Sequence, residues 1–331
     1  MDIGYDGGFY ATKAVSDGRR VTFPSFAARP TESLFTLNGH ARIVIDGAAC
    51  GRFLIGDEAI KLATGARKET ASWIGTDEYL ALFLAACSEL TRATWAGINL
   101  VTGLPVADFA RDKDALHNRL IGEHRFEREG RRGQTLRVES IRVIPQAWGA
   151  VLDLLLDDRG RIVRPELADA RVAVLDIGGH TVNYLAVNGL SDVPSETRGT
   201  ERGAWAVVRA VREYLDAQHP GLSRLKDHDL MTAIIDGELY DAGDLVDLRP
   251  AVDPILADVG QEIVDTASQY WGPGAATFRQ VLVIGGGAYL WGARVKQAFK
   301  QAIVLDAPEF ANARGFWRFA AHLSAKGADN G

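Results

Sequence analysis

The sequence predicts an α/β protein of two similar lobes that face one another across a cleft. Apolar strands alternate with amphipathic helices from Gly97 onward, which is typical of an α/β fold. A strand that ends in Asp-x-Gly occurs twice, at residues 6–8 ("DGG") and at residues 176–178 ("DIG"), and each time a threonine and an apolar return strand follow. Two such halves facing one another would bring both carboxylates to one cleft.

The composition is that of an ordinary globular protein. The 331 residues, 47% of them hydrophobic, can fill a sizeable core. A net charge of −6 gives no general attraction to nucleic acid or anionic lipid, although "HRFEREGRRG" can form a local basic patch. With only Cys50 and Cys87, a disulfide framework is excluded and a reducing compartment is indicated. The longest apolar run, residues 79–86, is far shorter than the ~20 residues that span a bilayer, so we expect a cytoplasmic protein without membrane contact.

The elements of the first half follow from their periodicity. Residues 1–15 predict strand, glycine turn and strand, and residues 19–30 add a third short strand. Alternation over residues 41–56 predicts a hairpin around Asp46-Gly47, followed by a helix with Asp57 as its N-cap. The next elements, in chain order, are a buried helix over 76–94, a buried strand over 97–106, an amphipathic helix over 107–122, a strand over 134–146 and a helix over 147–158.

A polar connector over residues 157–170 separates the two halves. The second half is predicted to contain strand, turn and strand over 174–187, a helix over 204–215, a strand over 280–284 and a helix over 288–301. The expected division is a first lobe over 1–160 with a small insert at about 20–75, a second lobe over 161–310, and a C-terminal helix over 311–331 that returns to the first lobe.

The two glycine turns have the composition of anion-binding sites. Glycine-rich turns after strands present several backbone N–H groups in one direction, and the missing Cβ lets phosphate oxygens approach closely. Two opposed turns would therefore hold one polyphosphate. Asp6 and Asp176, each at the end of an apolar strand, are placed to hold a hydrated Mg²⁺ shared with the phosphates, largely through water. Lys13, on the return strand, can reach the same phosphates.

Three further features fit a nucleotide. A third glycine cluster at residues 285–288 ("GGGA") lies between a strand and a helix and would seat a nucleoside. Gln146 follows the strand that ends at Pro145, and its amide can orient water, as nucleotide hydrolases require beside the γ-phosphate. His180, at the tip of the second turn, would touch phosphate.

Each of these features also has a simpler interpretation. Residues 176–187 can form an ordinary hairpin, and the third glycine cluster can be a tight turn between strand and helix. Lys13 can be a solvated strand lysine, Gln146 a helix cap and His180 an exposed surface residue. The combination of three glycine turns with two carboxylates favours the nucleotide site.

The turns resemble the phosphate-1, phosphate-2 and adenosine motifs of the actin, sugar-kinase and heat-shock chaperone superfamily. More narrowly, the chain resembles the bacterial and archaeal actin-like proteins of the ParM/StbA plasmid-segregation group. The matching motifs, in the order of the family, are "DGGFYATKAV", "VTGLPV", "VIPQAWGAVLDLL", "DIGGHTVNYLAV", "VIGGGA" and "APEFANARGF". The resemblance implies an actin-like fold of two ribonuclease-H-like lobes around a nucleotide cleft. It also implies ATP or GTP, Mg²⁺, slow hydrolysis, homopolymer filaments that move plasmid copies apart, and a DNA-binding adaptor protein rather than direct DNA binding.

The resemblance assigns roles to residues by position. Asp6 and Asp176 would serve the metal and the catalytic water, and Gln146 the nucleophile. The residues that would contact the nucleotide are Gly7, Gly8, Phe9, Lys13, Gly178, Gly179 and His180 at the phosphates, Gly285, Gly286 and Gly287 at the nucleoside, and Glu201, Arg202 and Gly203 near the ribose. Tyr10 and Ala11 stand where relatives often have Gly and Asn, and Asn183 stands where many have Asp, so the fine geometry of the site is expected to differ.

Two rival functions share this fold. A sugar-type kinase needs a carboxylate base aimed at a sugar hydroxyl, for which the sequence offers no clear candidate. A non-polymerising scaffold usually carries an amphipathic basic tail, whereas "HLSAKGADNG" at the C-terminus is neither amphipathic nor strongly basic.

Overall fold

The computed structural model describes residues 1–30, 43–62, 73–128, 131–222 and 224–329. In these residues the strands are β1 (Asp2–Gly7), β2 (Ala11–Ser16), β3 (Arg19–Pro24), β4 (Ala27–Ala28), β5 (Ile43–Gly47), β6 (Gly51–Ile55), β7 (Trp95–Leu104), β8 (Gly122–Arg128), β9 (Arg131–Pro145), β10 (Arg171–Ile177), β11 (Val182–Asn188), β12 (Ser191–Asp192), β13 (Arg198–Thr200), β14 (Glu238–Asp241), β15 (Asp244–Asp247), β16 (Gln280–Ile284) and β17 (Ala302–Val304). The α-helices are α1 (Asp57–Leu62), α2 (Asp77–Leu90), α3 (Val106–Leu120), α4 (Trp148–Leu155), α5 (Trp205–Gln218), α6 (Asp227–Asp236), α7 (Arg249–Trp271), α8 (Ala288–Ala298) and α9 (Ala311–Asp329).

The two main sheets begin with the same topology, which confirms the predicted similarity of the halves. The first has the strand order β3-β2-β1-β7-β9, in which β1 pairs antiparallel with β2 and parallel with β7. The second has the order β12-β11-β10-β16-β17, in which β10 pairs antiparallel with β11 and parallel with β16. The first sheet continues beyond β9 through β8, β5, β6 and β4. We call the parts built on these sheets the first and the second lobe.

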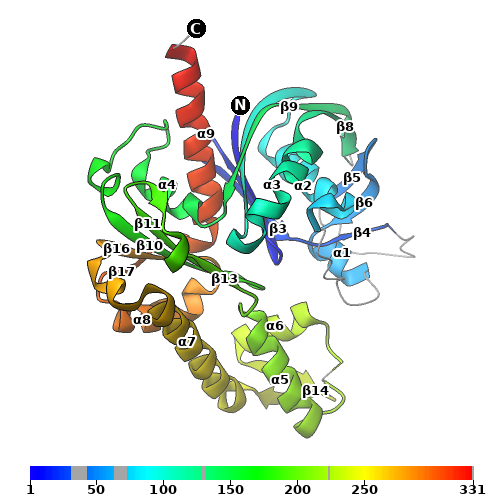
Figure 1. Ribbon diagram of the computed structural model, residues 1–331. Coiled ribbons are helices and arrows are strands. Elements are labelled where there is room, and N and C mark those ends of the chain that lie inside the picture. Colours follow the sequence, from blue (N-terminus) through cyan, green and yellow to red (C-terminus); the bar gives the residue numbers. More distant parts are fainter. Residues whose placement is uncertain (31–42, 63–72, 129–130, 223, 330–331) are drawn as a thin grey trace.

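Helices cover both faces of each sheet, as parallel strands require. In β10, Ala173 and Leu175 point into the core shared with α5, α7 and α8, whereas Val172 and Val174 point into the core shared with α4. This alternation follows from the two-residue period of a strand. On the first lobe, α2 and α3 cover one face, and α9 packs against β1 and β7 on the other. Figure 1 shows α4 and α9 side by side between the two sheets.

The crossing of α4 and α9 depends on two glycines. A Cβ at Gly315 of α9 would lie 1.8 Å from the Gly149 carbonyl oxygen of α4, and a Cβ at Gly149 would lie 2.5 Å from Asn312 Cα. Both distances are far below a van der Waals contact. The backbones therefore meet without intervening side chains, and this brings the start of α9 close to the second sheet.

Gly315→Ala should destabilise the protein by about 1–3 kcal/mol, because the added methyl forces the two helices apart. Gly327→Ala is the matched control, because it lies on the same helix and no described atom lies within 4 Å of a Cβ there. The control should be neutral or stabilising by up to about 1 kcal/mol, since alanine is the better helix former. Urea denaturation measures both; equal unfolding midpoints for the two variants would contradict the close crossing.

Two local predictions are corrected by the structure. The hairpin pairs Gly47 with Gly51, so its turn is at residues 48–50 and not at Asp46-Gly47; Gly51, at φ +78°, supplies the left-handed residue of this longer loop. Asp57 is the first residue of α1 and not its N-cap, because Ile60 N–H donates to the Gly56 carbonyl one position earlier. There its charge still favours the helix N-terminus.

The described part of the stretch "HRFEREGRRG" lies in a strand pair. Residues 124–128 belong to β8, which pairs antiparallel with β9 and β5. Arg128 forms an ion pair with Glu89, and Arg125 with Glu123. Of the predicted insert, residues 31–42 and 63–72 lie outside the described residues. None of the described helices is long and apolar enough to cross a membrane.

Candidate functional site

Two matching hairpins place the two carboxylates. In the β1–β2 hairpin Asp6 lies opposite Lys13, and in the β10–β11 hairpin Asp176 lies opposite Asn183. The spacing of seven residues is the same in both. Both aspartates end buried strands, with exposed fractions of 3% and 4%. The repeated sequence pattern therefore corresponds to a repeated structure that delivers one buried carboxylate from each lobe.

The turns of the hairpins require glycine. A Cβ at Gly8 would lie 2.8 Å from the Ala11 carbonyl oxygen, and a Cβ at Gly178 would lie 2.9 Å from that of Thr181. Gly178 N–H in turn donates to the Thr181 carbonyl at 2.9 Å. A side chain at either position would open the turn.

The second turn is oriented by the segment before α5. The carbonyls of Gly178, Gly179 and His180 accept hydrogen bonds from the N–H groups of residues 203–205 at 2.8 to 3.1 Å. Since the C=O and N–H of a trans peptide point in opposite directions, the N–H groups of this turn point away from α5. Such an arrangement of N–H groups suits an anion.

The third glycine turn closes the site beside Asp176. Gly285 has φ +82°, and a Cβ there would lie 2.4 Å from the Ile177 carbonyl oxygen and 2.7 Å from Asp176 Oδ1. Gly287 N–H donates to the same Ile177 carbonyl at 2.9 Å. At Gly286, by contrast, no described atom lies within 4 Å of a Cβ. Gly286 is thus the position of this turn that faces open space.

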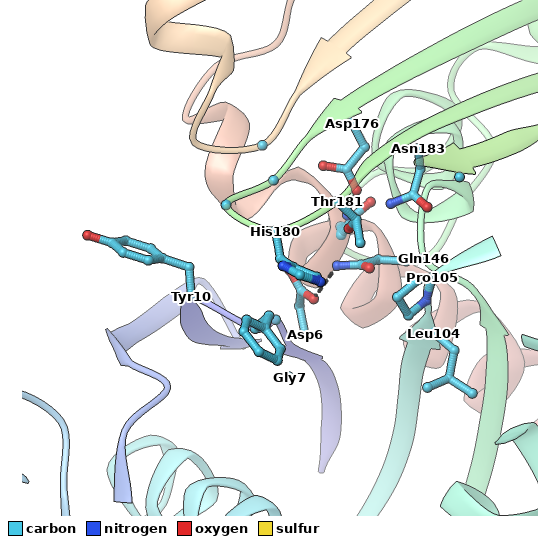
Figure 2. A pocket seen from close by; sticks show the side chains of 18 of the residues that line it. Asp6, Gly7, Tyr10, Leu104, Pro105, Gln146, Asp176, His180, Thr181 and Asn183 are labelled. Carbon is cyan, nitrogen blue, oxygen red and sulfur yellow. Dashed lines mark hydrogen bonds between the residues drawn. The ribbon is translucent and has the colours of Figure 1, made fainter. Parts of the chain in front are cut away.

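Amide side chains hold both carboxylates in place. Gln146, between β9 and α4, donates from Nε2 to Asp6 Oδ1 at 2.8 Å, as Figure 2 shows. Asn312, at the start of α9, donates from Nδ2 to Asp176 Oδ2 at 2.9 Å. Lys13 Nζ lies 3.5 Å from Asp6 Oδ2. Each carboxylate is therefore held in direction by one amide, that of Gln146 before α4 for Asp6 and that of Asn312 in α9 for Asp176.

The site has a deficit of positive charge at Asp176. Burial raises the pKa of this carboxyl to about 6, and the neighbouring charge of Asp6 acts in the same direction, while the hydrogen bond from Asn312 and the charge of Lys13 oppose the shift. A cation between the carboxylates would relieve this cost, because it stabilises the ionised form.

The donor set fits Mg²⁺. No group of three or more His, Cys, Asp or Glu that could hold a metal occurs in the part of the chain that the structure describes. Mg²⁺ is commonly bound by one or two carboxylates together with water and phosphate oxygens, and not by a cage of protein ligands. Asp6 and Asp176 supply the hard oxygen ligands that such a water-rich ion requires.

A cavity of about 750 Å³ joins the three turns. The predicted residues that line it are Asp6, Gly7, Gly8, Phe9, Lys13, Gln146, Asp176, Gly178, Gly179, His180, Glu201, Gly285 and Gly286. Phe9 of the first turn stacks on His180 of the second, with ring centroids 4.8 Å apart, so the two turns meet across the cleft.

Three predicted residues do not line the cavity. Arg202 is exposed and forms an ion pair with Glu262 of α7. Gly203 lies beneath the second turn, where a Cβ would be 2.5 Å from the carbonyl oxygens of Gly178 and Gly179. Gly287 packs on Ile177, where a Cβ would lie 2.3 Å from Cγ2. Both glycines support the turns from behind.

The positions at which the sequence departs from the family pattern have specific contacts. Tyr10 packs on Trp205 and stacks on His228, so its bulk lies against the second lobe. Asn183 Oδ1 accepts a hydrogen bond from Val106 N–H at the start of α3, 3.3 Å away. A neutral amide here avoids a third buried negative charge beside Asp176 and ties the second hairpin to the first lobe.

Sequence reasoning missed several residues of the cleft, among them Asn312, Tyr289 and Glu309. Asn312 and Glu309 belong to "APEFANARGF", which served only to mark the resemblance. The sequence feature that could have pointed to Asn312 is an asparagine among the mostly apolar residues that start α9. Asn312 is buried there, and a buried amide needs hydrogen-bond partners.

Two sheets of one topology, with opposed glycine hairpins and two carboxylates in the cleft between them, define the actin type of architecture. Comparisons with protein families agree: residues 4–149 match the family "Actin like proteins N terminal domain", and residues 174–297 match "Archaeal actin homologue MreB-like, C-terminal". The two matches together span most of the chain, which belongs to the actin-like proteins.

Solved structures show the same fold over nearly the whole chain. A 15-stranded ParM filament from Clostridium botulinum is 21% identical with a TM-score of 0.81, covering 96% of this chain and 98% of the other. The archaeal actin homologue Ta0583 is 20% identical with a TM-score of 0.81, covering 98% and 99%. Its complex with ADP has a TM-score of 0.77 at 20% identity and the same coverage. A comparison with curated proteins gave no match.

Proposed function

We propose that this actin-like protein forms filaments under the control of a bound nucleotide and hydrolyses ATP or GTP with Mg²⁺. The observation that carries the proposal is the meeting of Asp6 and Asp176, one from each lobe, at the base of two opposed glycine turns. A site assembled from both lobes is complete only when the lobes are close together. Its ligand therefore links them.

Each group in the cleft has a task in this proposal. The N–H groups of the two turns and Lys13 would hold the phosphates, and Asp6 and Asp176 would hold Mg²⁺ largely through water. Bound Mg²⁺ would neutralise the charge that develops on the transferred phosphoryl group. Gln146 is anchored through its amide nitrogen to Asp6, so its amide oxygen can accept a hydrogen bond from the attacking water.

Filament formation would follow from closure of the two lobes. A closed form presents a different surface from an open one, and a head-to-tail contact that prefers the closed form grows into an open helical polymer. The fold of this chain is also that of a ParM filament. By the same resemblance we propose a cytoplasmic role in plasmid or DNA segregation, with a DNA-binding adaptor protein as the partner.

The expected result is nucleotide-dependent assembly. The purified chain at tens of micromolar should form pelletable filaments with Mg²⁺ and ATP or GTP, but not with diphosphates or without nucleotide. The polymer should decay as hydrolysis proceeds, because loss of the γ-phosphate removes the link between the turns. Sedimentation and negative-stain microscopy measure this; a protein that stays monomeric in every condition would refute the proposal and favour a kinase or a scaffold.

A further inference from the structure

The cleft has a polar rim beside the third glycine turn to which the proposed function assigns no role. Tyr289 lies in the first turn of α8, and Glu309 lies in the short turn before α9. The Tyr289 hydroxyl donates to Glu309 Oε2 at 2.6 Å, and both residues line the cleft. The Tyr289 side chain nevertheless remains exposed, with an exposed fraction of 66%. The pair is thus accessible from the cavity.

The backbone holds this pair in a fixed place relative to the proposed nucleoside seat. Gly285 N–H donates to the Pro308 carbonyl at 2.9 Å, which joins the glycine turn to the residue before Glu309. Tyr289 N–H donates to the Gly286 carbonyl at 3.4 Å, and Gly286 is the residue of the turn that faces open space. A nucleoside on this turn would therefore have Tyr289 and Glu309 beside it.

The pair presents hydrogen-bond acceptors and no donor. A tyrosine carries one hydroxyl proton, and here that proton is directed at Glu309. The hydrogen bond to Glu309 raises the pKa of Tyr289 to about 12, and the charge of Asp306 acts in the same direction, so the phenol keeps its proton at neutral pH. What remains for a ligand are the lone pairs of the carboxylate and of the phenol oxygen.

We propose that Tyr289 and Glu309 read the base of the bound nucleotide and select guanine over adenine; this inference rests on the proposed nucleotide site. Guanine presents two neighbouring donors on its pairing edge, N1–H and the N2 amino group. Both can donate hydrogen bonds to the oxygen atoms of Tyr289 and Glu309, which only accept. Adenine places the N1 acceptor beside its N6 amino donor, so one acceptor would face the carboxylate. A pair of groups that can only accept therefore favours the base that offers two donors over the base that offers one donor and one acceptor.

The test compares diphosphates, which share the same phosphate contacts. Titration calorimetry of the full chain with Mg²⁺ and GDP, IDP or ADP should give the affinity order GDP, then IDP, then ADP. GDP should bind at least about tenfold more tightly than ADP, since a hydrogen bond to a charged group contributes about a factor of ten or more. IDP lacks only the N2 amino group, so it isolates one donor.

Two variants separate the role of the carboxylate from that of charge in general. Glu309→Gln keeps the shape but adds an amide donor, so the GDP to ADP ratio should fall about tenfold. Glu213→Gln on α5 makes the same charge change at an exposed position outside the cleft and should leave the ratio unchanged. The inference is overturned if the wild type binds GDP and ADP equally, or if Glu309→Gln leaves the ratio unchanged, while the nucleotide site itself stands. Absence of binding by any diphosphate would instead refute the proposed function.

Discussion

Asp176→Asn should strongly slow Mg²⁺-dependent hydrolysis and at the same time make the nucleotide-free protein more stable at neutral pH. Hydrolysis should fall by about 10³-fold, because loss of a metal-holding charge removes several kcal/mol of transition-state stabilisation. The variant should still fold, since asparagine has the same shape and its neighbours Asn312 and Asn183 can hydrogen-bond to an amide. A phosphate-release assay measures the first effect.

The stability gain should depend on pH. The carboxyl of Asp176 has an ordinary pKa of 3.8 and a raised pKa of about 6 in the folded protein. Between these values the folded state binds the proton more tightly than the unfolded state, so the wild type loses stability as the pH rises through this window. Above it the loss is complete and amounts to about 3 kcal/mol at most, since one pKa unit corresponds to about 1.4 kcal/mol.

Urea denaturation at about pH 4 and about pH 7.5 tests this linkage. The advantage of Asp176→Asn over the wild type should be small at the lower pH and larger at the higher one. Asp192→Asn, at an exposed position in the same sheet, serves as the control and should hydrolyse nucleotide at the wild-type rate. Hydrolysis by Asp176→Asn at the parental rate would remove this residue from the metal site, and a pH-independent difference in stability would contradict its buried charge.

Gln146→Ala should separate hydrolysis from nucleotide binding. The amide is held by Asp6 and can orient a water, but the proposed phosphate contacts come from the turns and Lys13. Its removal should therefore slow hydrolysis by about 10²-fold, as expected for the loss of a positioning group, and leave nucleotide affinity within a few-fold. Filaments of this variant should persist longer after addition of triphosphate, because turnover is what ends them.

Single-turnover hydrolysis, calorimetry with a non-hydrolysable triphosphate, and time-resolved light scattering measure the three quantities. Gln261→Ala, on the exposed side of α7 where its amide contacts Asp265, is the matched control and should resemble the wild type in all of them. If Gln146→Ala lost affinity in proportion to rate, the residue would be a phosphate ligand and not a positioning group for water.

Much of the fold and of the cleft could be predicted because the relevant signals are local. A glycine turn with a carboxylate before it and a return strand after it occupies about ten consecutive residues. Its glycines are required by the backbone conformation and by the close approach of neighbouring backbone atoms. The repeat of this pattern predicted two similar lobes, and the two sheets confirm it. Thirteen of the predicted site residues line the cavity, and most of them belong to these glycine turns.

Errors arose where several local solutions are nearly equal in energy. Asp46-Gly47 is a good two-residue turn, yet the chain turns at residues 48–50, because Gly51 supplies the left-handed conformation and both Asp46 and Gly47 stay paired with β6. Gly203 was assigned to the ligand, whereas it supports the second turn from behind. In both cases the glycine correctly indicated a turn or a close backbone contact. Which residues it contacts depends on the neighbours that the tertiary structure brings to it.

By itself the sequence determined the order of the elements, the glycine turns and the two carboxylates, because these follow from conformational preference and from the period of apolar residues. Only the tertiary structure decided which polar groups meet those carboxylates. Asn312 lies 136 residues from Asp176 in the chain, and Gln146 lies 140 residues from Asp6. These contacts depend on how closely α4 and α9 cross between the sheets, and such packing is set by many weak contacts acting together rather than by any short motif.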